Sequence, residues 1–433
     1  MVFELANKLG QDDKASHNFL TSLLSPSGSA FALPLGITVQ AQEASQLGVR
    51  FNATAGVARQ RGEPLALPSL LALLKTLSPA EIVDYAPTGG IPELRALWQN
   101  DLIRKNPSLI GQSFSLPIVT AGLSHAISLS FDLFAEQGDL VLCAEPSWEN
   151  YRLMACQRHS LTFKTFPLFD HEQKLNLSGL ARLGEEAIKA RQRKAFLILN
   201  FPHNPTGYTP LPQERQELLS LLGAWADRGM KLIVLLDDAY FGFFYEDYLD
   251  RESLFPALLK QPNLLAIKID GPTKEYYTWG LRLGFLTAAS PSFTVSDYAQ
   301  FENKALAAIR TSVSSASKIA QSLICKLLQS PSLQSECQFF WQKLKQRYAI
   351  TRRLCLSGAK TSLEPLPFNS GYFLTFKLSG QDAFSLRSYL LRQKSLGTIA
   401  LAPDLLRVTY ASLDEEDLPE FFTILFESVR LRS

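Results

Sequence analysis

Six short, continuous apolar runs constrain the fold of this chain more than any other feature of its sequence. They lie at residues 116–122, 139–148, 194–202, 231–240, 263–270 and 284–288, and most are rich in Val, Ile and Leu. Continuous runs of this kind are typical of strands that are buried on both faces of a sheet. Several of these runs are separated by segments with the spacing of a helix. In one such segment, Leu218, Leu222 and Trp225 recur at intervals of three and four residues. We therefore expect an α/β domain with a mostly parallel central sheet flanked by helices.

The pattern changes after about Pro331. A long helical stretch through Trp341, Leu344 and Tyr348 leads to the alternating segment 371–378 and a helix-rich C-terminus, which predicts a smaller α+β domain. The first 50 residues hold no long periodic pattern, and we expect a short helix and an extended arm there. The predicted division is 1–64 for the N-terminal arm and part of the small domain, 65–325 for the large domain, and 326–433 for the C-terminal small domain.

Composition narrows the class of protein. Apolar residues make up 46% of the chain, which is enough buried surface to offset the entropy of ordering it and excludes disorder. The 43 Lys and Arg nearly balance the 41 Asp and Glu. The chain therefore lacks the net positive charge with which a nucleic-acid-binding protein attracts phosphates. The 5 cysteines form no CxxC pair, so we expect reduced thiols and no metal site. We find no signal-peptide pattern or membrane span, and we expect a cytoplasmic protein with no membrane partner.

A lysine follows the run at 263–270 in an unusual setting. Doubly wound sheets bind ligands at the carboxyl ends of their strands, where the connections diverge. Lys274 is preceded there by a Gly-Pro pair and by Thr273, which give an irregular backbone and a hydroxyl. Arg282 follows between two nearby glycines, as suits a site where backbone approaches an anion. A lone lysine in such a place is usually a solvated surface residue, but these neighbours favour a functional one.

A pair of acidic residues ends the run at 231–240. Asp237 follows directly on the apolar residues, where a buried carboxylate needs a cationic partner inside the fold. Either Asp237 or Asp238 could instead cap a helix, which leaves one of the two carboxylates for another role.

A turn with the sequence NPTG follows the run at 194–202. Asn204 precedes a proline, which favours an extended backbone, and Gly207 permits a positive φ. Such a turn can hold the Asn204 amide over a cleft, although Asn-Pro pairs also mark many ordinary turns.

Taken together, the asparagine turn, the aspartate, the lysine and the Gly-flanked arginine resemble, in this order, the class I/II aminotransferases of fold type I. The resemblance runs from about Asn52 to Ala411 and includes the segments 51–70, 84–95, 120–127, 146–151 and 406–411. It implies a large domain with a mostly parallel sheet, a smaller α+β domain, and pyridoxal 5′-phosphate as the cofactor. It also implies a homodimer with shared active sites, and an amino acid and a 2-oxo acid as substrates.

The resemblance implies roles for the residues around the cofactor ring. Lys274 would form a Schiff base with the cofactor and later carry a proton between the substrate and the cofactor. Asp237 would hold the pyridine nitrogen protonated, so that the ring withdraws electrons. Asn204 and Tyr240 would form hydrogen bonds with the ring oxygen, and Trp148 would stack on the ring face.

The resemblance also implies a cradle for the cofactor phosphate. Ser124, Thr273 and Arg282 would bind it, together with the backbone of Leu123 at the start of a helix. Tyr85 would reach it from the second subunit of a dimer. Relatives often carry SxSK where this chain has GPTK, so a glycine stands in place of one hydroxyl and the cradle could be one donor short.

Substrate contacts follow from the same resemblance. Arg407 would clamp the α-carboxylate, Asn204 would contribute to the substrate site, and Gly56 would lie against the substrate where a side chain would collide. Arg310 falls where aspartate aminotransferases carry an arginine that crosses the interface to a distal carboxylate. The alternative for Arg310 is a structural ion pair with a carboxylate at that interface.

Two other functions remain open at this point. The same cofactor could support a β-lyase or a cyclising lyase, because fold and cofactor motifs do not decide how the chemistry ends. A non-catalytic sensor with a fold of this type is the other alternative. Only about 50 residues precede the first matching segment and they are not markedly basic, which is too little for a DNA-binding module.

Overall fold

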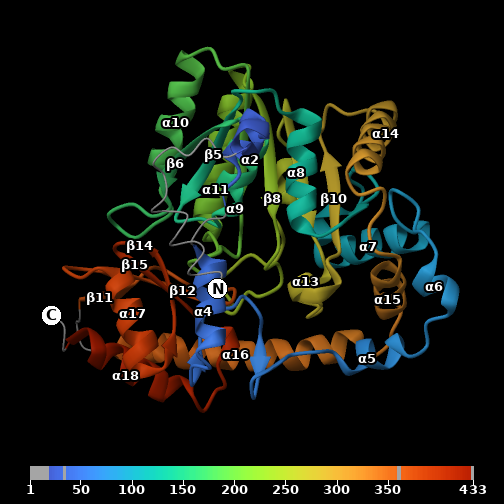
Figure 1. Ribbon diagram of the computed structural model, residues 1–433. Helices are drawn as coiled ribbons and strands as arrows, with labels where there is room; N and C mark the ends of the chain where they lie inside the picture. The colour runs from blue at the N-terminus through green and yellow to red at the C-terminus, as the bar shows by residue number, and fades with distance from the viewer. Residues whose placement is uncertain (1–18, 33–35, 358–361, 431–433) are drawn as a thin grey trace.

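The computed structural model describes residues 19–32, 36–357 and 362–430 (Figure 1). Its largest sheet has seven strands in the order β4-β10-β9-β8-β7-β5-β6. Their bounds are β4 Ile118–Thr120, β5 Leu140–Glu145, β6 Thr162–Pro167, β7 Lys194–Leu199, β8 Lys231–Asp237, β9 Leu264–Asp270 and β10 Gly284–Ala289. Strand β10 is antiparallel to both of its neighbours, and the remaining pairs are parallel. The predicted α/β fold with a mostly parallel central sheet is confirmed.

The helices of the described residues have the following bounds: α2 Phe19–Leu23, α3 Pro26–Ala30, α4 Ile37–Gln46, α5 Pro68–Leu74, α6 Pro79–Val83, α7 Pro92–Lys105, α8 Leu123–Phe134, α9 Asn150–Arg152, α10 Leu177–Lys189, α11 Pro212–Asp227, α12 Phe255–Leu258, α13 Pro272–Glu275, α14 Val295–Ser312, α15 Lys318–Leu328, α16 Leu333–Ser357, α17 Ala383–Lys394 and α18 Leu418–Arg430. None of them is long and apolar enough to cross a membrane.

Alternate residues of the central strands enter two separate cores. In β7, Phe196 and Ile198 pack into one cluster with α8, whereas Leu197 and Leu199 pack into the other with α10 and α11. Helices therefore cover both faces of the sheet, which explains why its strands read as continuous apolar runs. All six predicted runs contain a strand. The edge strand β6 was missed, because its exposed and partly buried residues alternate and give no apolar run.

A second sheet contains four antiparallel strands in the order β11-β12-β15-β14. Their bounds are β11 Leu363–Pro365, β12 Phe373–Leu378, β14 Ile399–Ala402 and β15 Leu405–Thr409. Figure 1 shows α16 running along the lower side of the molecule, from beside α15 towards this sheet. The predicted long helix and smaller α+β unit are confirmed. The predicted boundaries of the domains stay a prediction.

The N-terminal segment is more helical than predicted. Residues 19–46 contain α2, α3 and α4 within their described parts, where a short helix and an extended arm were expected. In α4, the Gln40 side chain donates to the carbonyl of Ala400 and accepts from its N–H, both at 2.9 Å. Strand β1 (Phe51–Asn52) continues the segment and pairs in parallel with β13 (Leu396–Gly397). Tertiary contacts of this kind stabilise a helix that has no long periodic pattern of its own.

Candidate active site

A cavity of 260 Å³ lies at the carboxyl ends of the parallel strands. It is lined by Ile37, Gly56, Val57, Leu123, Ser124, Trp148, Tyr151, Asn200, Asn204, Asp237, Ala239, Tyr240, Thr273, Lys274, Trp279, Arg282, Phe373 and Arg407. Trp148 follows β5, Asn204 follows β7, Asp237 ends β8 and Lys274 follows β9. Segments far apart in the sequence meet here because the carboxyl ends of parallel strands share one edge of the sheet. The roles predicted for these residues stay predictions, but the structure brings them together.

Asp237 is a buried carboxylate at the floor of the cavity. The Tyr151 hydroxyl donates to its Oδ2 at 2.5 Å, the Ala239 N–H donates to its Oδ1 at 3.1 Å, and the Asn200 amide donates to its backbone carbonyl at 2.7 Å. Burial raises the pKa of Asp237, and the hydrogen bond from Tyr151 and the charge of Lys274 oppose that rise. The carboxylate is therefore held in one orientation. A cationic or N–H partner in the cavity would offset the free-energy cost of burying its charge.

Lys274 lies in the short helix α13, which begins after Gly271. Its Nζ is 4.9 Å from the centroid of the Tyr240 ring and forms no hydrogen bond or ion pair with any described residue. Burial lowers the pKa of Lys274 to about 8, although Asp237 opposes the shift. About a tenth of the amine is therefore unprotonated at pH 7, and this is the form that attacks a carbonyl.

Gly271 fits this position because there is no room for a side chain. A Cβ added to it would lie 2.8 Å from the Leu283 carbonyl oxygen and 3.0 Å from the Leu123 side chain. The absence of a hydroxyl here, noted in the sequence, is thus a consequence of close packing between the β9–α13 turn and β10.

Arg282 and the start of α8 form one corner of the cavity. Arg282 has φ +51° and donates from Nη1 to the Trp279 carbonyl at 3.2 Å. Gly122 has φ +86°, and a Cβ there would lie 2.9 Å from Arg282 Nη2. The first N–H groups of α8 have no side-chain cap. Free backbone donors beside a guanidinium, with Ser124 and Thr273 lining the same cavity, match the chemistry of a phosphate.

Arg407 approaches the cavity from β15 in the second sheet. Its Nη2 donates to the Thr54 carbonyl at 2.6 Å, its guanidinium lies 4.7 Å from the Phe373 ring centroid, and its Nε has no partner. No described carboxylate forms an ion pair with it, and burial lowers its pKa to about 10. A buried guanidinium of this kind suits a carboxylate ligand. Gly56 lies close by, and a Cβ there would come within 3.2 Å of the Tyr240 hydroxyl.

In the Asn204 turn, the positive φ that Gly207 was expected to permit is confirmed. Gly207 has φ +76°, and the Asn204 N–H donates to Asn200 Oδ1 at 2.8 Å. The side-chain oxygen of Asn204 is buried and has no partner among the described residues. A polar atom in this state calls for a hydrogen-bonding ligand in the cavity.

Two predicted site residues lie outside the cavity. Tyr85 follows α6 and is 94% exposed, and Arg310 is exposed in the last turn of α14. Both were predicted to act on the active site of a second subunit, and those roles stay predictions.

Some residues of the site were missed by the sequence analysis. Tyr151 lies in the segment 146–151, which was compared with the family for Trp148 alone, and Asn200 directly follows β7, four residues before Asn204. Ile37, Val57 and Phe373 add an apolar wall from the N-terminal segment and the second sheet. Only the packing of those segments against the large sheet places them here.

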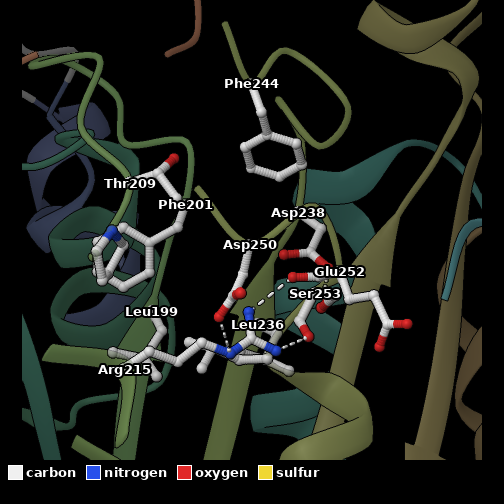
Figure 2. A pocket seen from close by; sticks show the side chains of 12 residues that line it. Leu199, Phe201, Thr209, Arg215, Leu236, Asp238, Phe244, Asp250, Glu252 and Ser253 are labelled. Carbon is white, nitrogen blue, oxygen red and sulfur yellow. Dashed lines mark hydrogen bonds and ion pairs between the residues drawn. The ribbon is translucent and has the colours of Figure 1, made fainter. Parts of the chain in front are cut away.

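A smaller cavity near Asp238 has a volume of 20 Å³, about the space of one water molecule (Figure 2). Arg215 crosses it and donates to the carbonyls of Glu252 and Ser253 at 2.7 and 2.5 Å, and it pairs with Asp250 at 3.6 Å. These contacts fasten the chain between β8 and α12. The cavity is too small for a substrate.

Comparison with known proteins gives a consistent result. The model of the family described as aminotransferase class I and II matches residues 60–425. The "Aspartate aminotransferase" of Sulfurisphaera tokodaii is 27% identical over 206 residues, 47% of each chain, so this match spans about half the length of that relative. The "Probable aspartate/prephenate aminotransferase" of Aquifex aeolicus is 27% identical over 355 residues, 78% of this chain and 81% of the relative.

Solved structures show the same fold. An aminotransferase from Anaerococcus prevotii matches with a TM-score of 0.82 and 22% identity, over 94% of this chain and 99% of that one. A kynurenine aminotransferase from Pyrococcus horikoshii matches with a TM-score of 0.79 and 16% identity, over 95% and 98% of the two chains. The resemblance drawn from the sequence is confirmed.

Proposed function

The chain belongs to the class I and II aminotransferase family, and from this premise we propose that it transfers an amino group between an α-amino acid and a 2-oxo acid with pyridoxal phosphate as cofactor. One arrangement supports the proposal most directly. Asp237 ends β8 and Lys274 follows the neighbouring strand β9, and the buried Arg407 guanidinium lines the same cavity without an ion pair to any of the described carboxylates.

The residues present fit pyridoxal phosphate. The unpartnered Asn204 oxygen marks a place for a hydrogen-bonding ring substituent, and the uncapped start of α8 with Arg282 marks a place for the phosphate. Ser124 and Thr273 would bind the phosphate, Asn204 and Tyr240 the ring oxygen, and Trp148 the ring face. When bound, the cofactor supplies an aldehyde for the amino group and a ring that withdraws electrons.

The side chains of this chain then have separate tasks. The Lys274 amine would act as the nucleophile towards the cofactor, and it would afterwards accept the proton from the substrate Cα and deliver it to the C4′ carbon of the cofactor. The Asp237 carboxylate keeps the ring nitrogen protonated and is itself held by Tyr151. Arg407 binds the α-carboxylate and orients the Cα–H bond, and Phe373 and Ile37 exclude water from one side of the cavity.

An activity screen tests this function. We expect purified protein with pyridoxal phosphate to convert 2-oxoglutarate to glutamate in the presence of at least one of the other nineteen common amino acids. Release of ammonia and a 2-oxo acid without any amino transfer would assign a lyase instead. Cofactor binding with no turnover of any of the amino acids would assign a sensor.

The proposal includes a cytoplasmic homodimer with composite sites. All five cysteines are free, which supports a reducing compartment. Exposed Val83 and Tyr85, with Ile82 at 41% exposure, form an apolar surface beside α6 that suits a second copy of the chain.

Mixing two inactive variants is expected to restore activity if Tyr85 acts across the interface. A dimer of Lys274→Ala with Tyr85→Ala has one intact site of two, so equal mixing should recover roughly a quarter of wild-type activity after subunit exchange. Activity of the mixture and size-exclusion chromatography check this result. Absence of recovery in a mixture that has formed mixed dimers would place Tyr85 in its own subunit's site, and a Tyr85→Ala variant that is active by itself would place it in neither.

We propose that Arg310 binds a distal carboxylate of the substrate. Arg310→Ala should then lower kcat/KM for glutamate or aspartate by about 10- to 100-fold and leave neutral amino acids unaffected, because one charge-assisted contact is lost. Lys304→Ala, an exposed cation on the same helix, is the matched control and should change neither. An equal loss for acidic and neutral substrates would make Arg310 a structural residue.

A further inference from the structure

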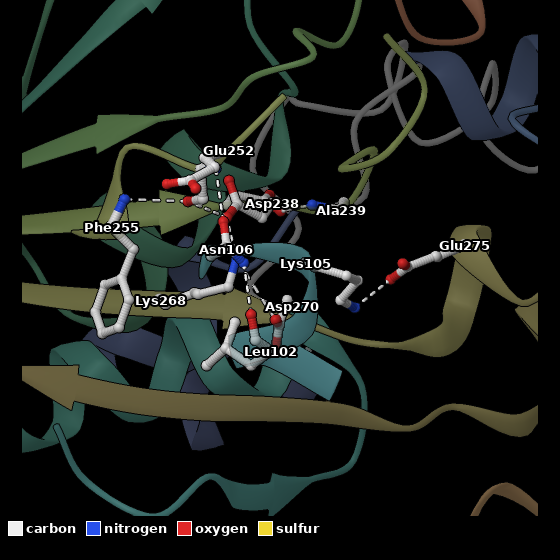
Figure 3. A network of polar contacts seen from close by, with 12 residues as sticks. Leu102, Lys105, Asn106, Asp238, Ala239, Glu252, Phe255, Lys268, Asp270 and Glu275 are labelled. Atoms are coloured by element: carbon white, nitrogen blue, oxygen red, sulfur yellow. Dashed lines mark hydrogen bonds and ion pairs between the residues drawn. The ribbon is translucent and has the colours of Figure 1, made fainter. Parts of the chain in front are cut away.

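Lys268, Asp238 and Asp270 form a group of buried charges that does not line the cavity (Figure 3). Lys268 of β9 is 1% exposed, and its Nζ forms ion pairs with Asp238 and, at 3.5 Å, with Asp270. The Ser253 hydroxyl also donates to Asp238 at 2.6 Å, and the Trp98 indole N–H donates to Asp270 at 3.0 Å.

We propose that Lys268 is a positioning residue for Asp237, because its ammonium neutralises Asp238 and so lets the adjacent Asp237 carboxylate stay charged against the cofactor ring. This inference rests on the proposed function, since Asp237 has this task only if the cavity binds pyridoxal phosphate.

Strand register gives Lys268 its influence on the site. Leu236 of β8 pairs with Lys268, Asp237 pairs with Ile269, and the Asp238 N–H donates to the Ile269 carbonyl at 2.9 Å. Successive residues of a strand point to opposite faces, so Asp237 faces the cavity and Asp238 faces Lys268. The same lysine also holds Asp270, which directly precedes the turn to Lys274. One ammonium therefore joins the ends of both strands that carry the proposed catalytic groups.

The charges around Asp237 make this neutralisation matter. The titratable groups around Asp237 are Tyr151 on α9, Lys274 on α13 and Tyr240 after β8, and the adjacent Asp238 acts on it from the other face of the sheet. Burial and the charge of Asp238 raise its pKa, whereas Tyr151 and Lys274 lower it. Without Lys268, the buried Asp238 and Asp270 carboxylates would lose the cation that they share, and Arg215 of α11 and Lys105 of α7 would remain as cations near them. The charge of Asp238 would then raise the pKa of Asp237 further. As the pH falls, Asp237 would therefore become protonated at a higher pH than in the wild-type protein.

Lys268→Met tests the inference through the pH dependence of cofactor binding and of kcat. We expect the midpoint of the acidic limb to shift to a pH about one unit higher in both profiles, because Asp237 becomes protonated at a higher pH. Binding of pyridoxal phosphate to the apoprotein is measured by quenching of tryptophan fluorescence. Asp238→Asn should move the limb downward, and the double variant Lys268→Met/Asp238→Asn should return it to the wild-type position.

Lys105→Met is the matched control. Lys105 is also buried and pairs with Asp101 at 2.9 Å and Glu275 at 2.8 Å, but it does not contact Asp238. It should lower the unfolding temperature and leave the acidic limb in place. An equal limb shift in Lys105→Met, or no shift in Lys268→Met, would overturn the proposal. If Lys268→Met does not fold, the absence of a downward shift in Asp238→Asn overturns it. A wild-type protein that binds no pyridoxal phosphate refutes the proposed function itself, whereas normal wild-type binding with unshifted variants refutes only the role of Lys268.

Discussion

Lys274→Ala is expected to lower the transamination rate by about 10³-fold or more, because one side chain provides both the nucleophile and the proton carrier. The variant should fold, since the Lys274 ammonium forms no hydrogen bond or ion pair with the described residues. It should also retain some affinity for pyridoxal phosphate through Arg282, Ser124 and Asn204, which line the same cavity. Rates in a coupled assay and cofactor binding by absorbance check both expectations.

Chemical trapping gives this prediction a second readout. Borohydride reduction of the wild-type protein with its cofactor should attach the cofactor covalently, as a label, to the peptide that contains Lys274. Mass spectrometry of the digested protein identifies that peptide. Lys231→Ala, an exposed lysine at the start of β8, is the control and should keep both label and activity. Label on another lysine in the wild-type protein would assign the nucleophile elsewhere.

Asp237→Asn should lower the rate by about 10²-fold or more while the protein remains folded. The asparagine keeps the shape of the side chain and can still accept from the Tyr151 hydroxyl, but it carries no charge to hold the ring nitrogen protonated. Single-turnover rates with saturating substrate measure the loss directly, because they separate chemistry from binding.

The neighbouring carboxylate supplies the matched comparison. Asp238→Asn removes the partner of Lys268 and should lower the free energy of unfolding by about 2 kcal/mol, with a much smaller effect on rate at the optimal pH. Denaturant unfolding and steady-state kinetics measure the two effects. Equal losses of rate in both variants would mean that Asp237 is not the carboxylate that acts on the ring.

The strands and their order along the chain could be predicted because both faces of the sheet are buried. A strand such as β8 then needs apolar residues along its buried length, which is residues 232–236, and its end is marked by the charge of Asp237. The edge strand β6 carries no such requirement, because half of its residues face solvent, and it was missed. Helix α4 was missed for a related reason, since its stability comes from contacts such as Gln40 with Ala400.

The chain by itself determined which residue types stand at the strand ends: Asn204, Asp237, Lys274 and Arg282 belong to short local motifs that can be read in sequence. Only the tertiary structure decided what surrounds them. Tyr151 lies 86 positions from Asp237 in the chain yet donates to it at 2.5 Å, and Lys268 lies 30 positions from Asp238 and reaches it from the neighbouring strand. Arg407 and Ile37 reach the cavity only because the second sheet packs against the first. Periodicity and local motifs record the solvent exposure and backbone needs of single segments, whereas partners from distant segments are fixed by how the elements pack.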